Sequence, residues 1–244
     1  MYPHLTNAPI SEAVLDIIVE PEDELSLERL EIFGKQVRAN FPDQGQIKTI
    51  EATFSEDSTI GAPLRRDEVN GYIYWNKDKT RAVQARRNGF AINHVRAQYT
   101  QWTDLKTEAV DLWNQYVAQI RPKSISRCAL RYINRIDVSI SANVGDILRT
   151  RIEVAPALPQ QINGYFLKVQ LPFLNDRHAI ITQAAQENLQ DASKMILILD
   201  IDTLARKSLP VMGASLWEEF EALRSIKNKC FFESLQPNVW EGYR

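Results

Sequence analysis

The chain has 244 residues, of which 44% are hydrophobic and 25% charged, with a formal net charge of -2. A chain of this length can bury a core that needs no disulfide framework, and Cys128 and Cys230 lie in apolar runs where we expect buried, reduced thiols. No stretch approaches the ~20 apolar residues of a membrane span, and the first residues lack the regions of a signal peptide. We therefore expect a cytoplasmic protein that does not enter a membrane.

The charges are unevenly distributed along the chain. Residues 1–60 contain 4 Lys and Arg against 12 Asp and Glu, whereas residues 61–140 contain 14 against 7. Two interpretations follow: the acidic first quarter pairs with the basic middle inside the protein, or the middle forms a basic face for an anionic partner. The sequence favours internal pairing.

The first half alternates strands and helices. A β-branched run between Pro9 and Pro21 predicts a strand, and apolar residues at helical spacing predict a helix over residues 26–41. A further strand is expected at 46–54. Residues 70–75, 80–86 and 89–95 predict three short strands joined by hairpin turns, and a second helix is expected over residues 103–120.

The clearest pattern in the chain lies at residues 127–140, which we interpret as a long central strand. Apolar residues recur there with a period of two and predict a buried face. The other face is too charged for a dry interior. The predicted buried face comprises Cys128, Leu130, Tyr132, Ile136, Val138 and Ile140, interrupted by Asn134, and the charged face carries Arg127, Arg131, Arg135 and Asp137.

Two carboxylates interrupt the first strand. Glu12 and Asp16 share one face of an otherwise apolar run, where an unpaired carboxylate is strongly unfavourable. We predict a structural ion-pair network that joins Glu12 and Asp16 to Arg131 or Arg135, with Asp137 as a further member. A catalytic role for Asp16 is the alternative.

The second half begins after a connecting segment, residues 141–162, in which a short helix is expected at 145–154. Residues 164–171 and 178–184 predict a hairpin, residues 194–201 a strand, and the region after residue 215 a helix. The chain therefore predicts an α+β fold with a mostly antiparallel sheet and long helices packed on one side. We expect one globular unit, 1–244, whose halves, 1–140 and 163–244, each run from a strand meander into a long helix.

Familiar catalytic motifs are missing from the sequence. None of the nine glycines lies in a phosphate-binding loop, and GxSxG and HExxH do not occur. His4, His94 and His178 lack metal-ligand spacing, so we expect surface or strand histidines and neither a metal nor a cofactor. Asp200 and Asp202 would share a strand face and could hold magnesium for phosphodiester chemistry, although a strand end followed by a turn is the preferred interpretation.

The basic middle supplies a candidate anion-binding group, namely Arg81, Arg86, Arg87 and Arg96. Arginines interleaved with aromatic side chains suit single-stranded nucleic acid. Arg81 and Arg87 have the same parity and are predicted to project from one face, whereas Arg86 projects from the other. The sequence pI of about 6.0 favours an ordinary solvated sheet face.

Three segments distributed over the whole chain carry a family resemblance: NAPISEAVLD at residues 7–16, LRYINRID at 130–137 and KNKCFFE at 227–233. Together they resemble a sporadically distributed family of uncharacterised bacterial proteins of similar length. The resemblance implies a bacterial cytoplasmic protein from a mobile or phage-defence locus. It implies no catalytic residues.

We therefore predict a non-catalytic protein-interaction or accessory protein of a bacterial mobile, phage-defence or toxin–antitoxin locus, with a protein partner. The alternative is a nucleic-acid-binding or nucleic-acid-processing module that uses the basic face of residues 65–135. The absence of a catalytic motif favours a binding protein over an enzyme. The sequence leaves oligomerisation open.

Overall fold

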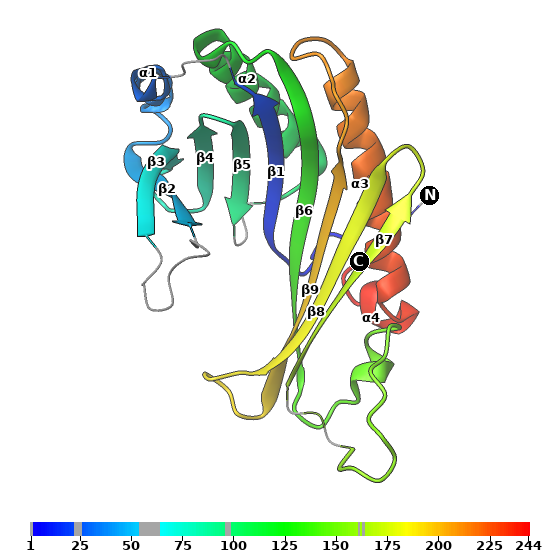
Figure 1. Ribbon diagram of the computed structural model, residues 1–244. Helices are drawn as coiled ribbons and strands as arrows, with labels where there is room; N and C mark the ends of the chain where they lie inside the picture. Colours follow the sequence, from blue (N-terminus) through cyan, green and yellow to red (C-terminus); the bar gives the residue numbers. More distant parts are fainter. Residues whose placement is uncertain (1, 22–25, 54–63, 96–98, 161, 163) are drawn as a thin grey trace.

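The computed structural model describes residues 2–21, 26–53, 64–95, 99–160, 162 and 164–244 (Figure 1). These residues form one nine-stranded sheet in which every neighbouring pair is antiparallel, with the order β2-β3-β4-β5-β1-β6-β9-β8-β7. The predicted α+β class with an antiparallel sheet is confirmed. The strands are β1 (Ile10–Glu20), β2 (Asp43–Thr53), β3 (Leu64–Trp75), β4 (Arg81–Arg86), β5 (Gly89–Val95), β6 (Ser124–Ser139), β7 (Tyr165–Phe173), β8 (Arg177–Glu187) and β9 (Lys194–Ala205).

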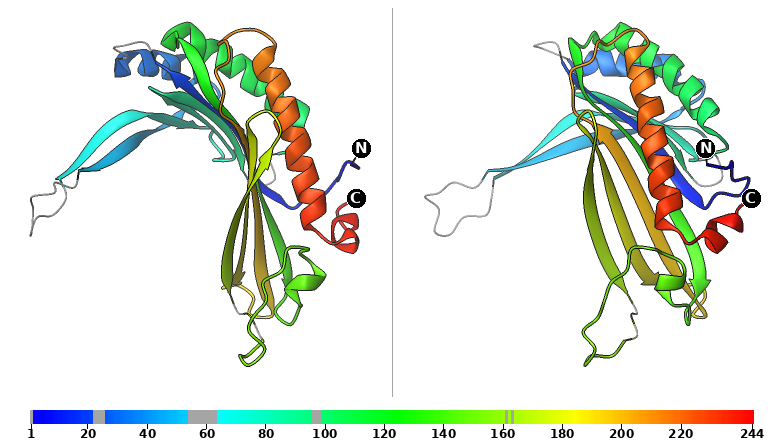
Figure 2. Two further views of the ribbon diagram at one scale, coloured as in Figure 1. Left: turned by 45° about the vertical axis from the view of Figure 1, so that its right-hand side comes forward. Right: turned by 90° about the vertical axis from the view of Figure 1, so that its right-hand side faces the viewer.

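The helices pack on one face of this sheet (Figures 1 and 2). Helix α1 packs on β3, β4 and α2, whereas α3 packs on β6, β9 and β8. The opposite face, called the helix-free face below, lies on the inside of the bend between the β2–β3 arm and the far ends of β6–β9 (Figure 2). The helices are α1 (Leu27–Val37), α2 (Trp102–Ile120), α3 (Ser215–Ser234) and α4 (Pro237–Glu241), with a 3₁₀ turn, η2, at Val144–Asp146.

The predicted central strand is confirmed as β6, which pairs with β1 on one side and with β9 on the other. Its predicted buried face is buried from Cys128 to Ile136, while Val138 is partly buried and Ile140 is exposed beyond the strand end. Asn134 interrupts this apolar face without an unsatisfied amide nitrogen, because its Nδ2 donates to the carbonyl oxygen of Leu199 at 2.9 Å. The strand therefore buries one face under α3 and leaves the other open.

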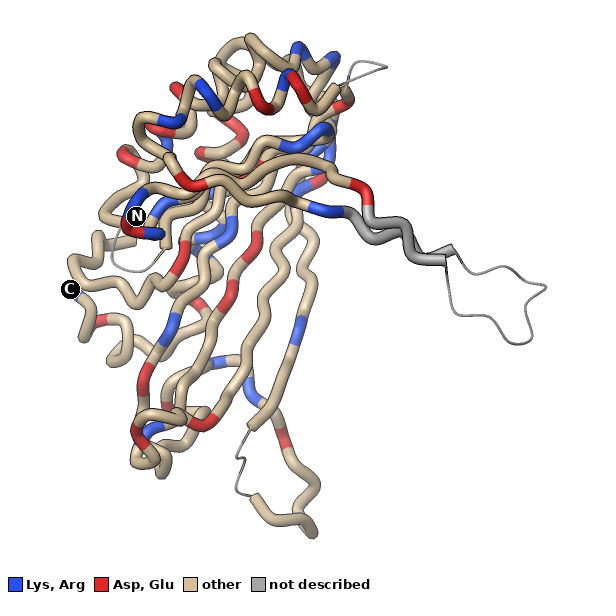
Figure 3. Tube along the Cα trace, turned by 90° about the vertical axis from the view of Figure 1, so that its left-hand side faces the viewer, with Lys and Arg blue, Asp and Glu red and all other residues tan. Residues whose placement is uncertain are grey.

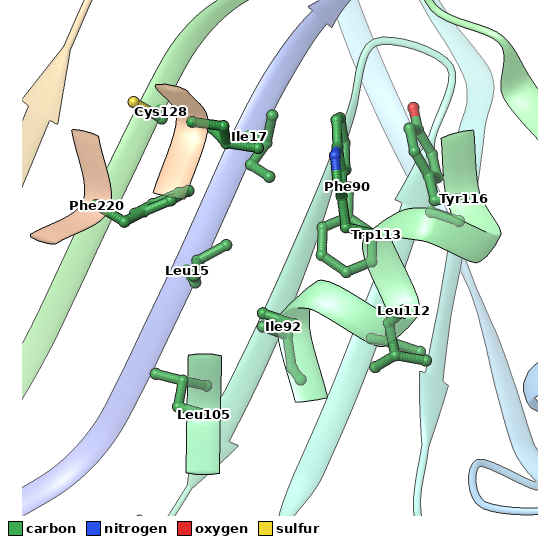
Figure 4. Packing of buried hydrophobic residues seen from close by; sticks show 14 of the residues in the cluster. Leu15, Ile17, Phe90, Ile92, Leu105, Leu112, Trp113, Tyr116, Cys128 and Phe220 are labelled. Atoms are coloured by element: carbon green, nitrogen blue, oxygen red, sulfur yellow. The ribbon is translucent and has the colours of Figure 1, made fainter. Parts of the chain in front are cut away.

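The core between the sheet and α2 is rich in aromatic residues (Figure 4). The ring of Phe90 lies 5.8 Å from Trp113 and 5.6 Å from Tyr116, centroid to centroid, in the edge-to-face and tilted geometries that aromatic pairs favour. The Tyr116 hydroxyl donates to the carbonyl oxygen of Arg86 at 2.8 Å, which ties α2 to the end of β4. Helix α1 approaches β3 closely at Gly34, since a Cβ there would lie 2.4 Å from the Tyr74 hydroxyl oxygen.

The connecting segment does not form the helix expected at 145–154. Only η2 is helical, and the following backbone bonds to the end of α3 instead of to itself. Arg149 N donates to Ser234 O at 2.8 Å, and Gln236 N donates to Ile147 O at 2.9 Å. Because Leu148 is fully buried beside Leu235, tertiary contacts have replaced the local helix. No helix in the described part of the chain is long and apolar enough to cross a membrane.

Candidate functional site: the helix-free face of the sheet

The helix-free face carries aliphatic side chains that no described element covers. Side chains alternate along a strand, so residues between the core positions of β1 point to this face. The uncovered face of an antiparallel sheet is ordinarily polar. Here aliphatic residues recur from β3 to β8, each partly exposed to solvent: Val14, Ile18, Ile73, Ile133, Ile180 and Ile198.

A chain of alternating charges runs across the same face, with Asp16 at its centre. Asp16 Oδ2 accepts a hydrogen bond from Arg86 Nη2 at 2.5 Å, and its Oδ1 accepts one from Arg127 Nη1 at 2.9 Å. The second amino group of Arg127, Nη2, lies 3.8 Å from Asp202 Oδ2. These four residues belong to β4, β1, β6 and β9. Figure 3 shows that basic and acidic positions lie on neighbouring strands of the sheet.

A second pair lies beside this chain of charges. Arg131 donates two parallel bonds to Asp200, from Nε to Oδ1 at 2.9 Å and from Nη2 to Oδ2 at 2.6 Å, the strong bidentate geometry of arginine and carboxylate. Glu12 accepts a hydrogen bond from Asn93 Nδ2 at 2.7 Å. Most charged groups on the face are therefore satisfied by one another.

Asp202 is the least satisfied carboxylate of the face. Its Oδ1 is buried and has no hydrogen-bond partner among the described residues. Burial raises the pKa of Asp202, and the positive charges of Arg127 and Arg131 oppose that shift. The carboxyl group therefore retains a proton to higher pH than a surface aspartate does.

Asp16 does not pair with the predicted Arg131 or Arg135, whereas the negative charge of Glu12 does act on Arg131. Asp16 stands opposite Ala129 in the β1–β6 register, and it bonds its diagonal neighbour Arg127 and the more distant Arg86. Arg131 turns instead to Asp200 on β9. Arg135 lies past the β1 register, which begins at Ile10 opposite Asn134, and Arg135 pairs with Asp137 of its own strand at 3.2 Å.

These contacts predict a clear contrast between two alanine variants. Arg135→Ala is expected to change the free energy of unfolding by less than about 0.5 kcal/mol, because the Arg135–Asp137 pair is 44% and 47% exposed. Asp16→Ala is expected to lower it by about 1–2 kcal/mol, since it removes the carboxylate shared by Arg86 and Arg127, whose side chains are only 17% and 26% exposed. Urea denaturation of both variants tests the contrast, and equal midpoints would contradict it.

The other arginines of the candidate anion-binding group are also paired where they are described. Arg81 points to the helix layer, where its Nη1 lies 2.8 Å from Glu108 Oε1, and Glu108 Oε2 lies 2.7 Å from Nε2 of the buried His94. Arg87 Nη1 lies 2.6 Å from Glu68 Oε1.

Alternation does not place Arg87 on the face of Arg81, because β4 ends at Arg86 and Arg87 belongs to the following turn. Only Arg86 of these three pairs with the acidic first quarter, through Asp16. Arg96 lies outside the described residues.

Metal binding is not supported by the geometry of the acidic residues. Within the described ranges, no group of three or more His, Cys, Asp or Glu side chains could hold a metal ion. Asp200 and Asp202 do share a face, as predicted, but they face the guanidinium groups of Arg131 and Arg127. Guanidinium groups occupy the positions that a cation would need.

Both cysteines are buried free thiols, as predicted. Burial raises the pKa of Cys128 to about 12 and that of Cys230 to about 11. Because the thiolate is the reactive form, neither thiol is activated as a nucleophile at neutral pH.

One buried charge cluster was not anticipated from the sequence. Glu219 of α3 is only 3% exposed, and its carboxylate accepts hydrogen bonds from Arg177 Nε at 2.5 Å and Nη2 at 2.9 Å and from Lys207. A signal was available: Glu219 falls within the inward stripe formed by Leu216, Phe220 and Leu223. The cluster ties α3 to β8 and has no open position for a substrate group.

A scan of protein-family models and a search of curated proteins found no significant similarity to this chain. The resemblance carried by residues 7–16, 130–137 and 227–233 therefore stays a prediction.

Proposed function

We propose that this is a non-catalytic protein-interaction or accessory protein, of the kind that a bacterial mobile, phage-defence or toxin–antitoxin locus would encode, and that its partner protein covers the helix-free face. The observation that carries the proposal is the alternation of uncovered aliphatic side chains with mutually paired charges on that face. Aliphatic and arginine side chains that lose water together are typical of protein interfaces. Because the arginines already hold aspartates in place, a partner meets a preorganised surface.

We further infer that the sheet consists of two related halves. On one side of the centre the order is β1, β5, β4, β3, with α2 after β5; on the other it is β6, β9, β8, β7, with α3 after β9. The strand order and the position of the helix are the same on both sides of the centre. This correspondence supports a unit, a strand meander followed by a helix, that occurs once in each half. Helix α1 and strand β2 have no counterpart among the described residues of the second half.

The interface proposal is tested by a double variant of the helix-free face. Ile133→Glu with Ile198→Glu places two charges among the uncovered aliphatic positions, and Ile32→Glu, at a 38% exposed position of α1, is the matched control. Affinity capture from the native host is expected to recover a partner protein with the wild type and with Ile32→Glu but not with the double variant. Circular dichroism and urea denaturation establish that all three proteins are folded.

Two results would contradict the proposed function. One is the same set of captured proteins for the double variant and the wild type. The other is turnover of a nucleotide or a nucleic acid by the pure protein, combined with the absence of any specific partner.

The nucleic-acid alternative leads to a separate prediction. Arg81, Arg86 and Arg87 hold carboxylates at hydrogen-bond distance, so phosphate would have to displace these acids. We expect no gel retardation of single-stranded RNA or DNA by the wild type at 50 mM salt, whereas phosphate-binding proteins bind tightly under such conditions. Retardation that persists at physiological salt and disappears in Arg81→Glu with Arg87→Glu would favour the nucleic-acid module.

A further inference from the structure

The edge strand β7 presents an apolar face to the helix layer, and the described helices cover this face only in part. Every second residue of β7 is apolar, and the residues between them include both polar and apolar types. This is the pattern of a strand with one face against a core. The neighbouring residues of β8 on the same face, Ala179, Ile181 and Ala185, are buried. Of the five apolar positions of β7, Leu171 is exposed, and the other four are only partly buried: Tyr165, Leu167, Val169 and Phe173.

The corresponding strand of the first half is covered. Tyr72 and Tyr74 of β3 are 5% and 2% exposed because α1 lies over them, and the Tyr74 hydroxyl donates to the carbonyl oxygen of Leu30 at 3.0 Å. On the other side, α3 packs on β6, β9 and β8, and no described helix lies over β7. Leu171 is 41% exposed there.

The described residues of the connecting segment supply no helix over β7, although Ile152 and Ile162 line a cavity together with Tyr165. Residues 141–160 follow β6 as α1 follows β1, yet they contain only η2 and bond to the end of α3 at Leu148 and Leu235 (Figure 1). The second half thus keeps the sheet and the helix α3 but lacks the helix that covers β3 in the first half.

We propose that the apolar face of β7, together with the adjoining side of α3, docks an amphipathic helix of a partner protein. A helix is the occupant that fits, because covering five side chains on a sheet face requires an element that lies over the sheet, at the level of α1, α2 and α3. A strand added to the free edge of β7, from a peptide or from a second copy, would pair the backbone and leave those side chains exposed. Ile226 of α3 is partly buried in the same cluster as Val169 and Phe173 and forms the inner wall of the site.

A buried amide beneath the site supports the same assignment. Gln183 of β8 stands beside Leu167 and is 1% exposed, yet neither its amide nitrogen nor its amide oxygen has a partner among the described residues. Buried amides are normally hydrogen-bonded. A polar side chain of a docked helix supplies the missing partner. This site is separate from the helix-free face and goes beyond the function proposed for that face.

Site-specific photo-crosslinking in the native host tests the proposal. The photoreactive residue p-benzoylphenylalanine replaces Leu171 in the full chain, and the control replaces Leu189, which is 97% exposed in the turn between β8 and β9. We expect Leu171, but not Leu189, to crosslink to a segment with apolar residues at helical spacing. A synthetic peptide of that segment should gain helical circular dichroism on binding, and Leu171→Asp should weaken its binding at least tenfold, whereas Leu189→Asp should not.

The proposal is overturned if Leu171 crosslinks to an extended segment, to lipid or to a second copy of this chain, or if it gives no adduct above the Leu189 control. Should Leu171→Asp fail to fold, Leu171→Ser provides the same comparison. The proposed function stands or falls separately, because the double variant of Ile133 and Ile198 leaves β7 unchanged.

Discussion

Replacing Glu219 by alanine is expected to lower the free energy of unfolding by about 3–5 kcal/mol, the range found when one member of a buried ion pair is removed. The carboxylate is 3% exposed and holds Arg177 and Lys207, of which Arg177 is itself only 18% exposed. Alanine would leave two positive charges facing each other without their anion. Lys207 is 32% exposed, whereas Arg177 of β8 cannot reach water fully without loosening the contact between α3 and β8.

The neighbouring residue provides the control. Glu218 is an exposed residue in the first turn of α3, so Glu218→Ala is expected to change stability by less than about 0.5 kcal/mol. Urea denaturation at neutral pH measures both variants. If Glu219→Ala lowers the free energy of unfolding by less than about 1 kcal/mol, the cluster contributes no more than exposed ion pairs do. That result would contradict the large contribution expected for a buried ion pair.

The pH dependence of the same cluster has a definite sign. Burial alone would raise the pKa of Glu219, but the hydrogen bonds and charges of Arg177 and Lys207 outweigh it and lower the pKa below the usual value of glutamate. The unfolded state then binds more protons between the two pKa values, so this contribution to stability is present at neutral pH and is lost as the pH falls through the folded-state pKa. The difference between wild type and Glu219→Gln should therefore shrink in acid.

Periodicity was sufficient to predict the buried face of β6 and the presence of α1. The alternation in β6 predicted its buried face from Cys128 to Ile136, and helical spacing over residues 26–41 predicted the helix that is observed as α1. Both signals are local, because side-chain direction along a strand or helix depends only on sequence spacing. The antiparallel α+β class followed from the same patterns.

The partners of the charged residues could not be predicted in this way. Alternation assigns Asp16 and Arg131 to one face, but it does not state which strands are neighbours. Asp200 comes from β9, which is 69 residues further along the chain than Arg131 and lies directly beside β6. Because β6 has β1 on one side and β9 on the other, Arg131 can choose between carboxylates of two strands, and it pairs with the one on β9. The predicted network therefore contained charged residues of the correct face but an incorrect partner for Asp16.

The edge position of β7 could not be predicted either, because alternation does not state which strands are neighbours. The sequence predicts a hairpin of residues 164–171 and 178–184, but the pattern of an edge strand with an uncovered apolar face is the same as that of a strand against a core. Only the order of the nine strands reveals that β7 ends the sheet. The exposed state of Leu171 is thus a property of the topology.

Lys227→Met is expected to stabilise the protein by about 2–4 kcal/mol at pH 6, and the gain should fall toward zero as the pH approaches 10. Lys227 Nζ lies 4.0 Å from the centroid of the Tyr132 ring, and no described carboxylate forms an ion pair with it. Burial, with a smaller contribution from the positive charge of Arg224, lowers the pKa of Lys227 to about 7. The cation–π contact offsets only part of the desolvation.

The sign follows from proton binding. Between pH 7 and 10.5 the unfolded chain keeps the ammonium proton that the folded protein has lost, so wild-type stability rises with pH over this range. Below pH 7 the Lys227 ammonium group is charged in the folded protein, and its desolvation then destabilises the fold most. Tyr132 and its hydrogen-bonded neighbour Tyr99 do not interfere, because burial raises the pKa of both phenols.

Urea denaturation of wild type, Lys227→Met and the exposed control Lys229→Met at pH 6, 8 and 9.5 measures the effect. A difference between wild type and Lys227→Met that stays constant from pH 6 to 9.5 would show that Lys227 remains charged throughout.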